Sequence, residues 1–138
     1  FTLDGLKARI SIFTNDGEFL GTIGQKGSGP GEYTYPSGFA FLRGGGMVVS
    51  DFGGHNLTFL DSSYSYQYSI TGFSPVVPVD PVTGPGSTFI GGCLDLVSSD
   101  EGYSGTSFLG RFTGEGMDPE YIYRSYPLTI EYRMEGEE

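Results

Sequence analysis

Apolar and polar positions alternate in short runs along the first half of the chain, and residues that form turns separate the runs. Between 7 and 13 the side chains alternate as in an extended segment, with Ala8, Ile10 and Ile12 on one face and Arg9, Ser11 and Phe13 on the other. Asn15-Asp16-Gly17 follows, and these residue types tolerate the positive φ that a hairpin turn requires. The pattern predicts a β-hairpin in which 7–13 pairs with a return strand over 18–23.

A similar order of elements recurs after a connection over 24–36, which is rich in glycine, contains two prolines and is expected to hold no regular element. Arg9-Ile-Ser-Ile-Phe13 aligns with His55-Asn-Leu-Thr-Phe59, at an offset of 59 − 13 = 46 residues. A period of about 40–50 residues with several short strands is typical of propeller blades. The strands expected in this second unit are four and antiparallel, over 38–42, 47–50, 56–60 and 64–70.

The pattern of the remaining chain is less regular, because prolines and polar residues interrupt it. The elements expected there are, in chain order, a short inner strand at 76–79, a buried strand over 89–97 with a bulge or bend at Gly91-Gly92, a polar turn over 98–105, a strand over 107–112, a loop over 114–120, and two short strands around Pro127 within 121–133.

Three groups of residues carry a resemblance to a known family. They are Arg9-Ile-Ser-Ile-Phe13 with Asp16-Gly17, Gly27-Ser-Gly-Pro-Gly31-Glu-Tyr with Pro36-Ser-Gly38, and Met47-Val-Val-Ser-Asp51 with His55-Asn-Leu-Thr-Phe59-Leu-Asp61. Their order resembles the NHL-type repeat and the related six-bladed β-propeller proteins of bacteria, over roughly residues 8–70. The resemblance implies an all-β fold built of antiparallel four-stranded blades.

On this interpretation the chain is one β-propeller segment. Residues 1–24 form the end of one blade, 36–70 a complete blade, 73–133 one or more degenerate blades, and 134–138 an acidic tail. Six blades of about 45 residues need about 270 residues, whereas the chain has 138. We therefore expect a partial propeller or a fragment of a six-bladed one, with a small self-contained β-domain as the alternative.

Composition narrows the range of partners and surroundings. Seventeen acidic and seven basic residues give a net charge of −10, which repels phosphate backbones, so nucleic acid is not expected as a partner. No apolar run is long enough for a transmembrane segment. Cys93 is the single cysteine and can form no internal disulfide. An acidic bacterial propeller is expected outside the cytoplasm, in the periplasm or at the cell surface.

Residues typical of enzyme active sites are scarce. One histidine and one cysteine are too few for a zinc site built on those ligands, and Gly24-Gln-Lys-Gly-Ser-Gly lacks the ending of a phosphate loop. No cofactor is therefore expected. Calcium is the weaker alternative, because the spacing of the loop acids differs from that of the twelve-residue calcium loop. These acids, which are better explained as solvated loop residues, are Asp100, Glu101, Glu115, Asp118 and Glu120.

The candidate binding residues lie in two segments that the propeller arrangement brings to one face. Strands that alternate in direction place the connection over 24–36 on the same face as the turn over 51–54. The partner-binding candidates on this face are Lys26, Glu32, Tyr33, Tyr35, Phe52 and His55. Exposed aromatic side chains on loops are typical of recognition surfaces. The alternative is that Tyr33 and Tyr35 pack beneath the connection.

Asp51, at the end of a predicted strand, is expected to hydrogen-bond a turn rather than act as a catalytic acid. The residues and the resemblance together favour a binding or interaction module without enzymatic activity, which presents a loop-rich face to a protein or a glycan. One alternative is part of a propeller enzyme, a lyase or hydrolase with its site in the central channel. Another is a structural subunit whose open sheet edges are completed by other subunits.

Overall fold

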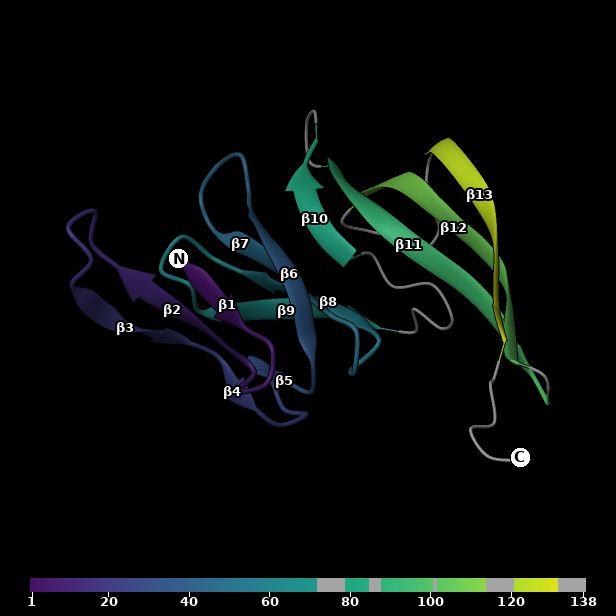
Figure 1. The fold of residues 1–138 in the computed structure, drawn as a ribbon. Coiled ribbons are helices and arrows are strands. Elements are labelled where there is room, and N and C mark those ends of the chain that lie inside the picture. Colours follow the sequence, from purple (N-terminus) through teal and green to yellow (C-terminus); the bar gives the residue numbers. More distant parts are fainter. Residues whose placement is uncertain (72–78, 85–87, 101, 114–120, 132–138) are drawn as a thin grey trace, which may run out of the picture.

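The computed structural model describes residues 1–71, 79–84, 88–100, 102–113 and 121–131 (Figure 1). Every regular element in these ranges is a β-strand, and the strands form three successive antiparallel sheets and one short parallel pair. The fold is therefore all-β, as the sequence predicts. None of the described residues forms a helix with the length and apolar character needed to cross a membrane.

The first two sheets follow the predicted hairpin and the predicted four-stranded unit. In the first sheet, β1 (Thr2–Asp4), β2 (Arg9–Phe13) and β3 (Phe19–Ile23) pair in sequence order. The second sheet, here called the central blade, also pairs in sequence order, and its strands are β6 (Pro36–Phe41), β7 (Met47–Asp51), β8 (Asn56–Leu60) and β9 (Tyr66–Thr71).

The connection between these sheets is more regular than the sequence predicts. Within 24–36, β4 (Gln25–Lys26) and β5 (Glu32–Tyr33) form a parallel pair. Gly27 N donates to Tyr33 O at 3.0 Å and Glu32 N donates to Gly29 O at 3.0 Å, so the segment folds back on itself. Gly31, with φ of 74°, makes this reversal without the steric cost of a side chain. The expectation that the segment holds no regular element was wrong.

The repeat between the first two sheets has a period of 47 residues rather than 46. Thr14 N donates to Glu18 O at 2.8 Å, and Asp61 N donates to Ser65 O at 2.9 Å, so equivalent turns lie 61 − 14 = 47 residues apart. The two turns that precede β2 and β8 end at Ala8 and His55, with φ of 53° and 50°. The alignment of Phe13 with Phe59 was therefore wrong by one residue.

The pairing of the strands next to each turn gives the physical reason for this correction. The strand pairs Phe13–Phe19 and Leu60–Tyr66 occupy the same place next to the turn, and each is followed by the same register shift. Phe13 is therefore the counterpart of Leu60, and Ile12 is the counterpart of Phe59. Matching residue types misled the alignment, because the turn and the register shift determine which positions are equivalent.

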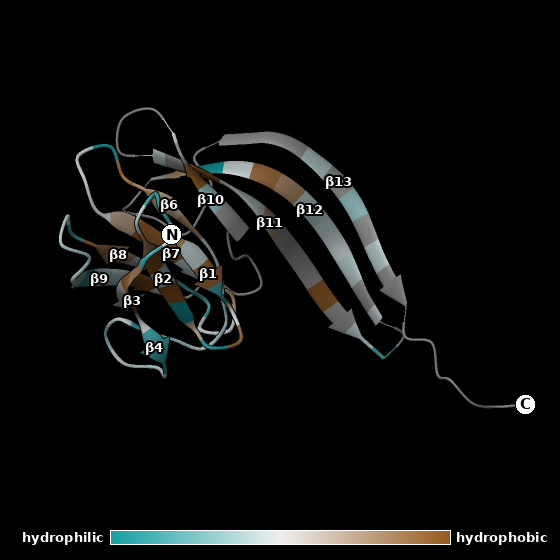
Figure 2. Cartoon of the chain, turned by 60° about the vertical axis from the view of Figure 1, so that its left-hand side comes forward, coloured by the Kyte–Doolittle hydropathy of each residue, from teal (hydrophilic) through white to brown (hydrophobic). Residues whose placement is uncertain are grey.

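Hydrophobic residues, brown in Figure 2, gather in the strands of the central blade. Alternate residues of β7 and β8 belong to two different buried clusters, one on each face of the blade. On the side of the first sheet, the buried cluster is Ala8, Ile10, Ile23, Tyr33, Met47, Val49 and Leu60. On the side of the third sheet, it is Ala40, Val48, Leu57, Phe59, Cys93, Phe108 and Phe112. Val48 and Val49 are neighbours in sequence but belong to different clusters, which is the signature of a strand buried on both faces.

The third sheet starts like a blade and then departs from the pattern. Its strands β10 (Val79–Thr83), β11 (Thr88–Ser99), β12 (Gly102–Thr113) and β13 (Tyr121–Glu131) pair in sequence order. β10 lies beside β6 of the central blade (Figure 1). The next three strands have 12, 12 and 11 residues, whereas those of the central blade have five or six. They extend well beyond the two smaller sheets.

Two predictions for this region were wrong, and a third was confirmed in part. The polar stretch 98–105 is not an extended turn, because β11 and β12 remain paired as far as Ser99 and Gly102. An irregularity does lie at Gly91-Gly92, in the pairing with β10, but the extra residue is on β10, between Val79 and Val82, and the pairing with β12 is regular. Pro127 does not separate two strands, since it pairs with Thr106 within the single strand β13. A proline is accepted there because β13 lies at the edge of the sheet.

Cys93 is expected to be inert towards thiol reagents while the chain is folded. It is buried against β12, and burial raises the pKa of its thiol to about 12, so almost none of the reactive thiolate is present near neutral pH. A chromogenic disulfide reagent should therefore react only as fast as the protein unfolds. A Cys93→Ala, Ser99→Cys variant, with its thiol at an exposed position of β11, should react at once. Rapid reaction of the native protein would contradict this prediction.

Candidate functional site

Asp51 joins the two segments that were expected to share a face. It is the last residue of β7 and is only 1% exposed. Its Oδ2 accepts a hydrogen bond from Thr34 N and its Oδ1 one from Tyr35 N, each at 2.7 Å. Phe52 N in turn donates to Tyr35 O at 3.0 Å. The interpretation of Asp51 as a residue that hydrogen-bonds a turn is confirmed, and its backbone partners belong to the connection over 24–36.

Three of the predicted residues form an exposed aromatic group on this face. Tyr35 is 50% and Phe52 40% exposed, and the Phe52 ring centroid lies 6.3 Å from that of His55. His55 is also exposed, and its positive φ turns the chain into β8. We call Tyr35, Phe52 and His55 the loop face. Whether it binds a partner stays a prediction.

Tyr33 is fully buried, so it follows the alternative in which a tyrosine packs beneath the connection. Its ring fills the space that a Cβ on Gly24 would need, and Gly24 has φ of 77°. Burial first, and then the charge of Asp51, raise the pKa of the Tyr33 hydroxyl to about 12. The hydroxyl has no hydrogen-bond partner among the described residues. Tyr33 therefore supports the connection from below and contributes nothing to the surface.

Lys26 and Glu32 lie on the short parallel pair rather than in the loop face. Lys26 is exposed on β4. The Glu32 carboxylate on β5 links three parts of the connection. Its Oε1 accepts a hydrogen bond from Gln25 Nε2 at 2.7 Å, and its Oε2 accepts one from Gly29 N at 2.9 Å. Gly27 fits beneath the Glu32 side chain, and a Cβ at that position would collide with the carboxylate.

The Glu32 carboxylate is expected to titrate below its ordinary range in the folded chain. The hydrogen bond from Gln25, followed by that from Gly29, lowers its pKa from the usual 4.5. Because the folded pKa is depressed, these contacts stabilise the connection fully above the unfolded pKa, and the stabilisation is lost as the pH falls through the folded pKa. Carboxyl NMR titration should show this lowered pKa. In a Gln25→Ala variant it should move back towards 4.5, and an unchanged value would contradict the assigned cause.

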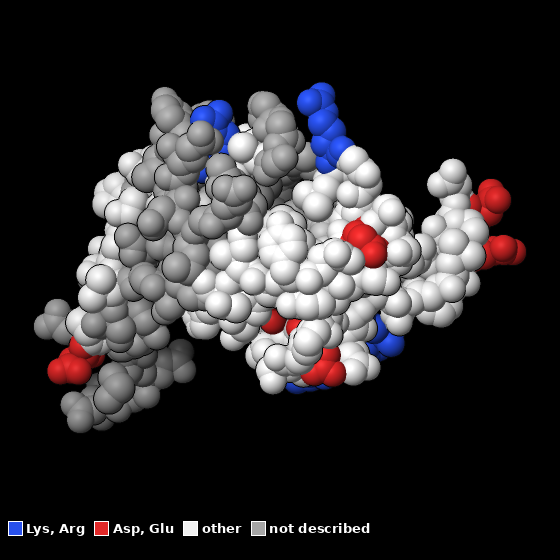
Figure 3. Space-filling view, turned by 180° about the vertical axis from the view of Figure 1, so that it is seen from behind, with Lys and Arg blue, Asp and Glu red and all other residues white. Residues whose placement is uncertain are grey.

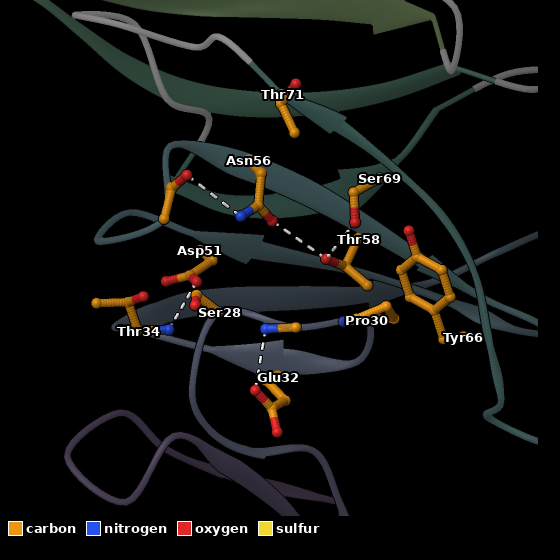
Figure 4. A pocket seen from close by; sticks show the side chains of 12 residues that line it. Ser28, Pro30, Glu32, Thr34, Asp51, Asn56, Thr58, Tyr66, Ser69 and Thr71 are labelled. Carbon is orange, nitrogen blue, oxygen red and sulfur yellow. Dashed lines mark hydrogen bonds between the residues drawn. The ribbon is translucent and has the colours of Figure 1, made fainter.

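A polar cleft of about 340 Å³ lies beside Asp51, between the connection and strands β8 and β9 (Figure 4). One wall is the connection, and the other is the face of β8 and β9 that looks towards it. The residues that line the cleft are Ser28, Gly29, Pro30, Glu32, Thr34, Asp51, Gly54, Asn56, Thr58, Tyr66, Ser69 and Thr71. The cleft is thus lined mainly by hydroxyl, amide and carboxylate groups, with the Tyr66 ring at one end.

The hydrogen bonds at the floor of this cleft run in one direction. Thr58 Oγ1 donates its single hydrogen to Asn56 Oδ1 at 3.1 Å, because a carbonyl oxygen can only accept. The 3.0 Å contact between Thr58 and Ser69 must then have the Ser69 hydroxyl as donor. Asn56 Nδ2 continues the chain to Gly54 O at 3.2 Å. Ser69 therefore keeps its acceptor lone pairs available on the side of the cleft.

Glu32, a predicted binding residue, lines the cleft, whereas the residues of its floor, Asn56, Thr58 and Ser69, were not predicted. The signal was present, because Asn56 and Thr58 on β8 pair with Thr71 and Ser69 on β9. Two adjacent strands thus carry polar side chains at alternate positions on one face. In a strand whose other face is buried, such a polar face indicates either solvent or a ligand site.

Within the described ranges, the charged side chains form no further candidate site. The described part of the chain contains no group of three His, Cys, Asp or Glu side chains arranged to hold a metal ion. Of the calcium candidates, Asp100 lies in the turn after β11, and Glu101, Glu115, Asp118 and Glu120 lie outside the described residues. On the side of the molecule seen in Figure 3, basic and acidic side chains are scattered rather than gathered into one large patch.

Comparison with known proteins supports the architecture. No curated protein matches the chain. A family model described as a 6-bladed beta-propeller matches residues 1–90. This match covers the first sheet, the central blade and the start of the third sheet, and it ends where the long strands begin. The chain belongs to the 6-bladed beta-propeller family.

Proposed function

We propose that this propeller segment is a non-enzymatic interaction module, and that its loop face of Tyr35, Phe52 and His55 binds a protein partner. The observation that supports it is the double hydrogen bond of Asp51 to Thr34 N and Tyr35 N. These bonds fix the connection over 24–36 against the turn over 51–54 in the unbound chain. As a finer proposal, the blades are of the NHL type, which the 47-residue repeat supports.

A fixed aromatic surface suits protein recognition for two reasons. Rigid loops lose little conformational entropy on binding, so more of the contact energy appears as affinity. Tyrosine is enriched among the residues that dominate protein interfaces, because it combines a large apolar ring with a polar end. Tyr35 and Phe52 expose such rings from two segments joined by backbone hydrogen bonds.

Site-specific crosslinking tests this proposal. A photoreactive amino acid placed at position 35 or 52 should give a discrete protein adduct in extracts of the source cells. Unlabelled chain should compete for that adduct, and a Tyr35→Ala, Phe52→Ala double variant should not. The matched control is the same photoreactive residue at Leu20, which is 64% exposed on the first sheet and away from the loop face.

Two results would overturn the proposal. The first is the same adducts from position 20 as from positions 35 and 52, because this would indicate unspecific contact with exposed apolar positions. The second is competition by the double variant as strong as that by the unchanged chain. Far-ultraviolet circular dichroism of the double variant verifies that the sheets remain intact, so that lost competition reports the surface and not the fold.

A further inference from the structure

The polar cleft, a second surface distinct from the loop face, combines hydrogen-bond acceptors with hydroxyl groups that can also donate. Glu32 and Asp51 contribute carboxylates, which accept only when ionised. The Ser69 hydroxyl donates towards Thr58 and so also faces the cleft as an acceptor. A ligand that donates as well as accepts hydrogen bonds therefore fits the cleft better than one that only accepts. Ionised phosphate, sulfate and carboxylate groups mainly accept, and the net charge of −10 repels them.

Hydroxyl groups of the ligand fit the cleft better than a positive charge does. Both carboxylates already have N–H partners, Asp51 with two backbone amides and Glu32 with Gly29 N and Gln25 Nε2. A cation would therefore compete with bonds that hold the connection in place. The hydroxyl groups along β8 and β9 can exchange hydrogen bonds with a ligand without breaking the connection.

Tyr66 adds an apolar surface to this polar wall. It is partly exposed on β9, and its Cβ packs near Gly31 of the connection. Figure 4 shows its ring at one end of the cleft, beside Pro30 and across from Asn56 and Asp51. A pyranose ring has hydroxyl groups at its rim and an apolar C–H face, so it matches a site that has hydroxyl acceptors along one side and an aromatic ring at its end.

We propose that the cleft between the connection and β8–β9 binds a neutral oligosaccharide segment, with Ser69 accepting from a sugar hydroxyl and Tyr66 packing on a sugar ring. The volume of about 340 Å³ is at the lower end of the range for small-molecule sites. It suits one or two sugar rings rather than a long chain. The site is independent of the loop face, because neither Tyr35, Phe52 nor His55 lines it.

The test is an NMR titration of the isotopically labelled 138-residue chain with neutral trisaccharides of glucose, galactose and mannose, in both α- and β-linked forms. At least one should cause saturable shifts at amides of 28–34 and 66–71. Ser69→Ala and Tyr66→Ala should each weaken its binding by about tenfold or more, which corresponds to the loss of one well-made contact.

The repeat supplies matched control variants. Thr22 and Phe19 stand 47 residues before Ser69 and Tyr66, at the same places in the β2–β3 hairpin, and both are exposed outside the cleft. Thr22→Ala and Phe19→Ala should leave sugar binding unchanged. A Tyr35→Ala, Phe52→Ala variant should also bind the sugar normally, which separates this proposal from the one for the loop face.

Three outcomes would overturn the proposal. One is the absence of saturable shifts with every trisaccharide. Another is equal weakening by Thr22→Ala and Ser69→Ala, which would indicate a general effect on the sheets. The third is that an arginine-rich peptide binds the cleft in place of sugars, with an affinity that falls steeply between about 50 mM and about 500 mM salt. Sugar binding should be insensitive to the same change in salt.

Discussion

Replacing Asp51 by alanine should lower the free energy of unfolding by about 3–5 kcal/mol. The carboxylate is almost completely buried and accepts two 2.7 Å hydrogen bonds from the backbone. Removing it leaves Thr34 N and Tyr35 N without these acceptors, and each unpaired amide costs about 1–3 kcal/mol where water cannot replace the partner. The loss is measured by urea unfolding, followed by circular dichroism.

Asp4 is the matched control, because it stands 51 − 4 = 47 residues before Asp51 in the repeat. It accepts a single backbone bond, from Lys7 N at 3.0 Å, and its side chain is partly exposed. Asp4→Ala should cost less than about 1 kcal/mol. Equal losses for the two variants would show that the connection is not held by Asp51. Asp51→Ala should also raise amide exchange over 27–35 before the rest of the chain responds.

Replacing Phe112 by alanine should have an effect of similar size at the opposite face of the central blade. Phe112 on β12 is 0% exposed and belongs to the cluster that joins β11 and β12 to Leu57 and Phe59. Truncating a buried phenylalanine typically costs about 3–5 kcal/mol, through lost burial and the cavity that remains. We expect the long strands to lose amide protection first, because this cluster connects them to the blade.

Leu109 provides the comparison within the same strand. It lies three residues before Phe112 on β12, points to the other face and is 43% exposed. Leu109→Ala should change the stability by less than about 1 kcal/mol. If both variants unfold at the same urea concentration, the third sheet does not depend on the packing of Phe112 against the central blade. A uniform loss of protection over all three sheets would instead show that they unfold as one unit.

The fold of the first 71 residues could be predicted because local signals agree there. The turn at Asn15-Asp16-Gly17 and the alternation of apolar residues both point to the same hairpin. The second unit repeats them, and β8 has the predicted bounds of 56–60. The repeat period was wrong by one residue, because two phenylalanines look alike in sequence although Phe13 is exposed and Phe59 is buried.

The third sheet was harder to predict because the ends of β11 and β12 that meet at 98–105 are polar. Ser98, Ser99, Ser104 and Gly105 carry no apolar alternation, so nothing local distinguishes an extended hairpin from a loop. What fixes them as strands is the continuous ladder from β11 through β12 to β13, in which Ser104 pairs with the distant Thr129 and Gly105 with Leu128. The cleft could not be predicted for a similar reason. Its two walls, the connection and strands β8 and β9, are separate in sequence and come together only in the folded chain.

Pro127 has a consequence for how this protein behaves at high concentration. β13 is the outermost strand of the third sheet among the described elements, and its backbone groups along that edge offer a template for a strand from another molecule. A proline in the middle of the strand removes one donor from the template and interrupts any added ladder. Pro127 therefore opposes the edge-to-edge pairing of molecules that leads to fibrils. Without it, β13 would present an uninterrupted edge of 11 residues for such pairing.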